Sequence, residues 1–295
     1  MNQTKPLQGK RIGIFGKGGA GKSTLTVLLA RLLWKRSYPV CVLDADSTNI
    51  GLATAFGLPQ PEKPLLDLYG GMVFQGGAVS CPVDDPRRLE NAELTLEDLP
   101  PAYSTNNGAG LTLLEAGKIA GQGPGAGCDG PIAKIARDLV IHSRGADPVA
   151  LLDFKAGFED SARGVITGLD FGLMVVDPTL ASVELAAHFV DLVRQIKAHH
   201  PPATEHLENP ALARTAREIF SRAKIQDIYL VLNKIQHVKE EKTLRRKLAE
   251  KGLEPAAVLP SDPNISPAWL SGQPVRSPAA ERALQPIADR LERAA

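Results

Sequence analysis

Short apolar segments recur along the chain and alternate with stretches of helical periodicity. Segments that are apolar at consecutive positions predict strands at residues 11–15, 40–43, 111–114, 149–152, 173–176, 228–232 and 256–259. Strands of this kind are covered on both faces, and helices between them indicate parallel crossovers. The pattern therefore predicts an α/β fold, with a mostly parallel sheet flanked by helices on both faces.

Two segments interrupt this alternation. Residues 59–109 are rich in proline, glycine, asparagine and acidic residues, and residues 198–210 have the composition of a loop before a helix near 211–224. The sequence contains no internal repeat and no low-complexity tract. We therefore expect a single domain over residues 1–295, with surface insertions at about 59–109 and 198–210.

Several of the predicted strands run into a glycine or a polar residue. These residues are Gly16, Asp44, Asp153, Asp177 and Asn233. The carboxyl ends of parallel strands lie along one edge of a sheet, and ligands bind in the crevice outside that edge. The sequence therefore predicts that these five residues lie along one binding edge.

The loop after the first predicted strand has the pattern G-x-x-x-x-G-K-S, from Gly16 to Ser23. It follows an apolar strand and opens a predicted helix at 22–35, which is the context of a phosphate-binding P-loop. Glycines let backbone N–H groups turn towards an anion, and the helix N-terminus supports them. We expect Lys22 to reach the β- and γ-phosphates and the Ser23 hydroxyl to bind Mg²⁺. The alternative is a plain glycine turn with an exposed lysine. The predicted nucleotide contacts are Gly18, Gly19, Ala20, Gly21, Lys22, Ser23 and Thr24.

A second lysine, Lys17, stands at the start of this loop. Residues 17–23 (K-G-G-A-G-K-S) match every position of the deviant loop of the MinD/ParA family of P-loop ATPases. The chain resembles this family over roughly residues 10–195 and 226–276. The resemblance implies a P-loop NTPase fold and an ATP-bound homodimer, in which Lys17 reaches the phosphates held by the facing subunit. Lys17 and Lys22 are therefore candidate catalytic residues.

Two acidic loops resemble the switch regions of this family. Residues 44–49 (D-A-D-S-T-N), the first switch loop, imply that Asp46 orients the attacking water while Asp44 supports the Mg²⁺ shell. In the alternative, both carboxylates only cap this loop. Residues 153–157 (D-F-K-A-G), the second switch loop, follow a Walker B strand, so that Asp153 would hold Mg²⁺ through water. Such carboxylates suffice because phosphoryl transfer is catalysed mainly by positioning and charge neutralisation.

The last two predicted strands carry candidate contacts to the nucleoside. Asn233 and Lys234 end an apolar strand where the family places an asparagine that reads the adenine. Residues 259–262 (L-P-S-D), with Pro260 and Asp262, stand where family members close over the base and ribose. The alternative for Asn233 is a turn former at the end of a strand.

Within the family, the chain resembles the CooC-type ATPases that mature nickel enzymes such as carbon monoxide dehydrogenase. Residues 153–164 are similar to their D-x-x-A-G-x-E-H-x-x-R-G, with Asp160 in place of the histidine. Residues 117–119 (G-K-I) and 127–128 (G-C) resemble their G-K-I…G-C-x-C, with only the first cysteine kept. Cys128 is therefore a candidate ligand of Ni²⁺ or Zn²⁺. Two such thiolates from a dimer fall short of a closed tetrahedral site, and a structural cysteine is the alternative.

Composition narrows the classes of function. A net charge of +1 gives no reason to expect a polyanion or an anionic membrane as an obligatory partner. Three widely separated cysteines fit a reducing cytoplasm better than a disulfide framework. The tail at residues 277–295 carries charges of both signs and is interrupted by Pro286, unlike a basic amphipathic membrane anchor.

The sequence thus predicts a cytoplasmic, Mg²⁺-dependent ATPase that cycles between ATP and ADP, dimerises on ATP and acts on a protein client. The alternative is a partition or positioning ATPase whose dimer binds DNA or a protein surface. Residues 239–242 and 245–247 would form its basic face, but glutamates interrupt them, so DNA is not favoured. An iron–sulfur reductase is not favoured either, because the regions that would supply a second cluster cysteine contain none.

Overall fold

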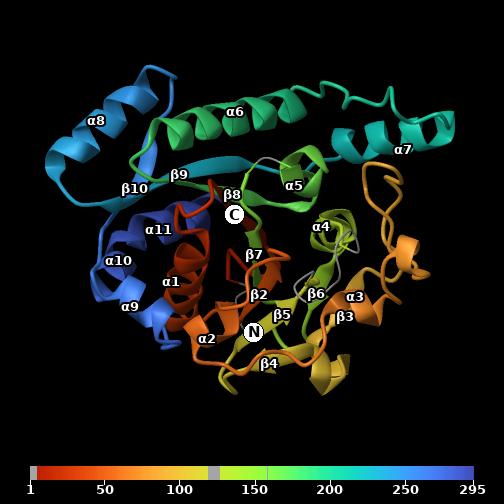
Figure 1. The fold of residues 1–295 in the computed structure, drawn as a ribbon, viewed down its shortest axis with the longest axis horizontal. Helices are drawn as coiled ribbons and strands as arrows, with labels where there is room; N and C mark the ends of the chain where they lie inside the picture. Colours follow the sequence, from red (N-terminus) through yellow and green to blue (C-terminus); the bar gives the residue numbers. More distant parts are fainter. Residues whose placement is uncertain (1–4, 119–126, 158) are drawn as a thin grey trace.

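The computed structural model describes residues 5–118, 127–157 and 159–295. At its centre lies an eight-stranded sheet with the strand order β10-β9-β8-β1-β7-β2-β5-β4 (Figure 1). Neighbouring strands are parallel throughout, except that the edge strand β4 runs antiparallel to β5. Helices cover both faces of this sheet. The predicted α/β fold is confirmed.

The seven predicted strands correspond to seven strands of the sheet, and three short strands were not predicted. A strand of three residues is too short to show a periodicity, which is why the sequence gives no signal for β3, β4 and β6. The strands are β1 (Arg11–Gly16), β2 (Val40–Ala45), β3 (Glu93–Thr95), β4 (Ser104–Asn106), β5 (Leu111–Glu115), β6 (Val140–His142), β7 (Val149–Phe154), β8 (Phe171–Val176), β9 (Asp227–Ile235) and β10 (Pro255–Pro260). Strands β3 and β6 pair with each other in a separate two-stranded sheet.

The predicted first helix coincides with α1, and the helix expected after the 198–210 loop is α7. None of the helices in the described part of the chain has both the length and the apolar character that crossing a membrane requires. The helices are α1 (Lys22–Lys35), α2 (Leu52–Phe56), α3 (Leu65–Leu68), α4 (Asp129–Asp138), α5 (Glu159–Ala162), α6 (Leu180–Lys197), α7 (Pro210–Ser221), α8 (Val238–Ala249), α9 (Ile265–Leu270), α10 (Pro278–Ala283) and α11 (Gln285–Ala294).

Side chains that alternate along the strands fill two cores, one on each face of the sheet. On β1, Ile12 and Ile14 belong to the core that contains α1, α10 and α11, whereas Phe15 belongs to the opposite core with α4, α6 and α8. The Phe15 ring stacks on Phe154 with 4.7 Å between ring centroids and contacts Phe189 at 4.5 Å. The central strand is therefore fixed from both sides where it enters the phosphate loop.

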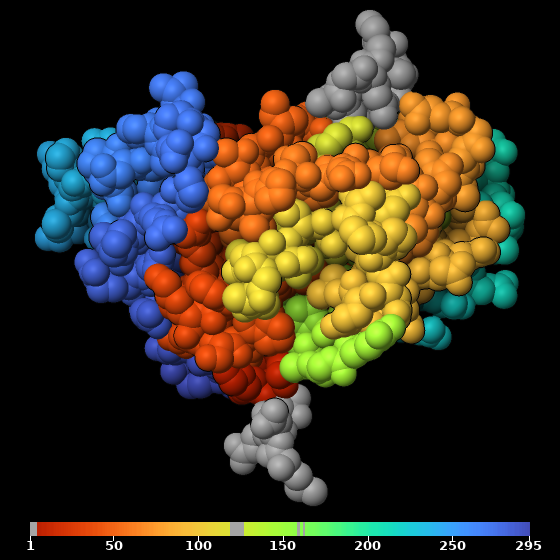
Figure 2. Space-filling view, turned by 90° about the horizontal axis from the view of Figure 1, so that it is seen from below, coloured from red at the N-terminus to blue at the C-terminus, as the bar shows by residue number. Residues whose placement is uncertain are grey.

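The segment at 59–109 covers one face of the molecule and also contributes to its interior. Figure 2 shows residues 50–115, in orange and yellow, spread across that face. Leu65, Leu66 and Met72 are buried in the same core as Phe15. The segment also contains β4, which extends the central sheet by one strand. It is therefore packed against the sheet along part of its length.

We expect Phe15→Ala to lower the free energy of unfolding by about 3–5 kcal/mol, because it leaves a cavity between two other aromatic rings. Urea denaturation with an unchanged m-value would measure this loss. The control is Leu270→Ala, since Leu270 is 91% exposed; it should stay within about 0.5 kcal/mol of wild type. A similar midpoint for both variants would contradict the packing role of Phe15.

Candidate functional site

The loop between β1 and α1 has a backbone that only glycine can adopt at two positions. Gly16 has a φ of 151° and Gly21 a φ of 100°, both outside the range that other residues prefer. A Cβ atom on Gly21 would lie 2.2 Å from Nδ2 of Asn233, and one on Gly16 would lie 2.7 Å from the carbonyl oxygen of Val175. Residues of β8 and β9 therefore contact the loop directly and leave no room for a side chain at either glycine.

Asn233 and Lys234, predicted to contact the adenine, brace the phosphate loop in this structure. Asn233 Nδ2 donates a hydrogen bond of 2.8 Å to the carbonyl oxygen of Ala20, and Lys234 Nζ donates one of 2.7 Å to that of Gly19. Both residues also line the cavity described below. The sequence placed them at the correct edge but gave no sign of their bonds to the loop.

Lys22 is a largely buried cation, with 7% of its surface exposed. Burial lowers the pKa of its ammonium group, while the negative charges of Asp153, Asp46 and Asp160 act in the opposite direction. Within the described part of the chain, the ammonium has no hydrogen bond and no ion pair. Burying a charge without a paired partner is costly. The loop is therefore arranged to receive an anion.

Two buried carboxylates, Asp44 and Asp153, lie side by side in the register of β2 and β7. Burial raises the pKa of Asp44 to about 8, although Lys118 Nζ, 2.6 Å away, works to lower it. Burial likewise raises the pKa of Asp153 to about 6. The Thr26 hydroxyl donates to Oδ1 of Asp153 at 3.2 Å, while Oδ2 has no partner among the described residues. An unpartnered buried carboxylate oxygen fits a hard cation such as Mg²⁺ or its water.

Asp46 and Asn49 hold the first switch loop in place. Asp46 Oδ1 accepts hydrogen bonds from the Thr48 amide at 2.9 Å and from the Thr48 hydroxyl at 2.7 Å. This is the capping arrangement that the sequence left open as an alternative. Asp46 also lines the same cavity as Lys22. Asn49 Nδ2 donates to the hydroxyl of Ser23 at 3.1 Å, which ties the loop to the start of α1.

A cavity of about 620 Å³ opens along this edge of the sheet. Three predicted residues, Ala20, Asp44 and Asp153, are buried and outside its lining, and Lys17 is also absent from it. Ile265 and Trp269 line it as well, and no sequence signal was available for them because α9 is too short to show a helical period. The predicted residues that line it are Gly18, Gly19, Gly21, Lys22, Ser23, Thr24, Asp46, Asn233, Lys234, Pro260 and Asp262.

Lys17 forms an ion pair with a carboxylate of its own chain. Its Nζ lies 3.5 Å from Oδ2 of Asp177, and its side chain is 36% exposed. The Thr179 hydroxyl donates to Oδ1 of Asp177 at 2.7 Å, which fixes the carboxylate at the end of β8. Both residues were placed at this edge by the sequence, but their pairing was not foreseen.

Cys128 stands at the N-terminus of α4, where its Sγ accepts a hydrogen bond from the Gly130 amide at 3.4 Å. Cys81 also packs against Gly130, with its Sγ 2.6 Å from where a Cβ atom on that glycine would lie. The residues that the structure describes contain no group of three or more His, Cys, Asp or Glu side chains arranged to hold a metal. Ile119 of the predicted G-K-I motif lies outside the described residues, as does Phe158 after the second switch loop. Transition-metal binding by Cys128 stays a prediction.

A family model described as the CobQ/CobB/MinD/ParA nucleotide binding domain matches residues 14–275. That range runs from β1, through the phosphate loop and both switch loops, to the end of the cavity lining. The chain belongs to this family. The phosphate loop, Asp44, Asp46 and Asp153 are accordingly parts of a MinD/ParA domain.

Individual relatives agree with this assignment. An uncharacterised ATP-binding protein of Methanocaldococcus jannaschii is 32% identical over 178 residues, covering 60% of this chain and 70% of that protein. The carbon monoxide dehydrogenase accessory protein CooC of Rhodospirillum rubrum is 30% identical over 195 residues, covering 63% and 70%. The septum site-determining protein MinD of Pyrococcus horikoshii, solved with Mg-ADP, is 15% identical with a TM-score of 0.59, covering 96% and 95%. This last likeness is one of fold.

We expect Gly21→Ala in this MinD/ParA domain to lower nucleotide affinity by more than about tenfold, equivalent to about 1.4 kcal/mol. The added methyl group would collide with Asn233 and displace the loop. Gly252→Ala is the matched control, because Gly252 also has a positive φ, of 69°, but has open space around it. Calorimetric titration with ADP and Mg²⁺ would compare them, and equal affinities would contradict the geometry described for Gly21.

Proposed function

We propose that this chain is a Mg²⁺-dependent ATPase of the cytoplasm that dimerises on ATP and serves a protein client, as a CooC-like accessory protein for a metalloenzyme. The observation that carries the proposal is the unpaired ammonium group of Lys22, a largely buried residue, at a cavity that Asp46 also lines, beside the buried carboxyl groups of Asp44 and Asp153. The ammonium group of Lys22, which can bind phosphate oxygens, thus lies near carboxyl oxygens that can bind a divalent metal ion. This combination suits a nucleoside triphosphate with its metal ion.

The proposed roles divide among the residues by their chemistry. The loop amides and Lys22 bind the phosphate oxygens, while Ser23 and Asp153 are the candidates to hold Mg²⁺, with Asp44 in support. When bound, the ion would neutralise negative charge on the phosphates. Asp46 then holds the attacking water in line, for which Oδ2 of its carboxylate is available because both bonds from Thr48 go to Oδ1.

Exposed apolar side chains that follow the carboxyl ends of the strands support a subunit interface at this edge. Ile50, Leu180, Val238 and Leu270 follow the carboxyl ends of four different strands and are between 63% and 91% exposed. Apolar groups gathered on one side of a protein are typical of interaction surfaces. In the proposed ATP-bound dimer, Lys17 leaves Asp177 and reaches the phosphates of the facing subunit.

The identity with CooC of R. rubrum favours a client protein over DNA as the partner. The basic residues of α8 are in part already neutralised, since Arg245 pairs with Glu241 at 2.7 Å and Lys247 with Glu250 at 2.8 Å. DNA binding relies on cations that can displace counterions from phosphates. The proposal does not require a transition metal at Cys128.

We expect Asp46→Ala to keep ATP binding and to slow hydrolysis by about a hundredfold, the size of effect that removing a group acting on the proton or the nucleophile produces. Phosphate release at saturating ATP would measure it. Asp84→Ala removes an exposed carboxylate outside the cavity and should leave turnover unchanged. If Asp46→Ala turned over within about twofold of wild type, Asp46 would be a loop cap only.

We expect Lys17→Ala to leave ATP binding to the monomer largely intact while weakening ATP-dependent dimerisation and hydrolysis. The charge of Lys17 offsets repulsion between two ATP-bearing faces only in the dimer, where water is excluded. Sedimentation with ATP and Mg²⁺ in an Asp46→Ala background would compare chains with and without Lys17. Equal dimerisation of the two chains would show that Lys17 has no cross-subunit role.

A further inference from the structure

The carboxylate of Asp129 joins the two switch loops. The hydroxyl of Ser47, in the first switch loop, donates a hydrogen bond to Oδ1 of Asp129. Lys155, in the second switch loop, donates one from Nζ to Oδ2 at 2.6 Å. Each oxygen of a single carboxylate therefore takes a bond from a different loop that faces the phosphate site.

These bonds are sheltered from water. Ser47 is fully buried, and the side chains of Lys155 and Asp129 are 32% and 14% exposed. Burial works to raise the pKa of Asp129, but the hydrogen bonds from Lys155 and Ser47 outweigh it and hold that pKa below its ordinary value. Asp129 is therefore an ionised group with both oxygens engaged. It also begins α4, where a negative charge favours the helix dipole.

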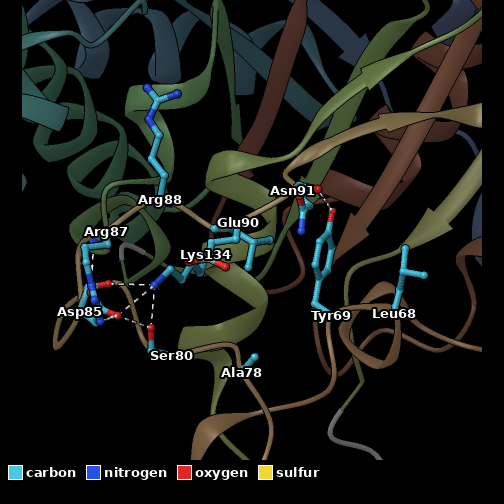
Figure 3. A pocket seen from close by; sticks show the side chains of 11 residues that line it. Leu68, Tyr69, Ala78, Ser80, Asp85, Arg87, Arg88, Glu90, Asn91 and Lys134 are labelled. Atoms are coloured by element: carbon cyan, nitrogen blue, oxygen red, sulfur yellow. Dashed lines mark hydrogen bonds and ion pairs between the residues drawn. The ribbon is translucent and has the colours of Figure 1, made fainter.

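The far half of α4 holds a different part of the chain. Lys134 Nζ donates to the hydroxyl of Ser80 at 2.6 Å and to the carbonyl oxygen of Asp85 at 3.1 Å (Figure 3). Asp138 accepts a hydrogen bond of 2.8 Å from the amide of Leu89. Residues 80–89 are thus fastened to α4 through its side chains.

A second cavity, of about 380 Å³, lies where this segment meets α4. Figure 3 shows Lys134 reaching from α4 towards Ser80 and Asp85, with Tyr69 on the opposite side of the same pocket. This pocket has no residue in common with the lining of the cavity of about 620 Å³ at the edge of the sheet. The ten-residue helix α4, about 15 Å long, carries Asp129, which is bonded to both switch loops, and Lys134, which lines the second cavity.

We propose that Asp129 is a positioning residue that couples the two switch loops to α4, and that α4 carries their nucleotide-dependent change to residues 80–89. This inference rests on the proposed ATPase function and names the surface that the nucleotide state reaches. Loops that respond to a γ-phosphate rearrange when it binds or leaves. Ser47 and Lys155 belong to those loops, so their movement pulls on Asp129, and a helix moves as a unit.

The test is hydrogen–deuterium exchange of the full-length chain with Mg²⁺ and either ADP or a slowly hydrolysed ATP analogue. In wild type, the backbone amides of Asp85, Arg87, Arg88 and Leu89 should exchange at rates that differ between the two states by about tenfold. In Asp129→Asn, which keeps the shape and loses the charge, that difference should fall below about threefold. Analogue affinity should stay within about threefold of wild type.

Two controls separate coupling from simple support of the helix. Asp84→Asn removes an exposed carboxylate from the same segment and should keep the wild-type difference. Lys134→Met removes part of the connection at the other end, since Asp138 still accepts the bond from Leu89. Residues 44–49 and 153–157 should then respond to nucleotide as in wild type, while the difference at residues 85–89 becomes smaller. A merely structural Asp129 would raise exchange equally in both nucleotide states and preserve their ratio, which would overturn the proposal.

The remaining outcomes are also decisive. If wild type binds the analogue but residues 85–89 exchange at the same rates in both states, α4 does not transmit the nucleotide-dependent change. The inference then fails while the ATPase proposal stands. If wild type does not bind the analogue, the proposed function fails and the inference fails with it. Should Asp129→Asn not fold, Ser47→Ala removes one of the two bonds and should reduce the difference in part; an unchanged difference would overturn the coupling.

Discussion

Two carboxyl groups buried side by side are the constraint on which the rest of the site depends. Asp44 and Asp153 are in register on β2 and β7, so both carboxylates emerge at the same edge. Removing a carboxylate from water costs several kcal/mol unless cations or hydrogen bonds compensate. Lys118 pairs with Asp44, and the charge of Lys22 acts on Asp153. A shift of one residue between these strands would turn one carboxylate to the opposite face. The register of the sheet is therefore tied to the chemistry of its edge.

The sequence predicted the central sheet well because its signals are local. Consecutive apolar positions marked each long strand, and the glycine pattern marked the turn into α1. Short elements gave no such signal, so β3, β4 and β6 were missed. The segment at 59–109 has polar composition overall, yet Leu65 and Met72 are buried in the core. Their burial depends on contacts with residues that are distant in the sequence, and the spacing of apolar residues along the chain does not predict those contacts.

For the candidate site, the sequence indicated which residues to consider but not which contacts they make. Lys22, Ser23 and three glycines of the phosphate loop line one cavity together with Asp46, whereas Lys17 and Ala20 do not. The bond from Asn233 to the carbonyl of Ala20 joins residues 213 positions apart, which only the fold can bring together. The pairing of Lys17 with Asp177 is of the same kind. The sequence contains no signal for the role of Asp129, because a carboxylate that joins two loops has no sequence pattern.

Two of the ion pairs near the phosphate site, Lys17–Asp177 and Lys155–Asp129, differ in how much free energy their separation requires. Lys17 and Asp177 are 3.5 Å apart with Lys17 partly exposed, and a pair of this kind is worth about 0–1 kcal/mol. Lys155 and Asp129 form a shorter, charge-assisted hydrogen bond in a more covered place. Releasing Lys17 therefore takes less free energy than separating the switch loops. A ligand shifts such equilibria only by its difference in affinity for the two states. In the proposed ATPase cycle, the γ-phosphate is the group that ATP has and ADP lacks, so the free energy for the more costly change would come from its contacts.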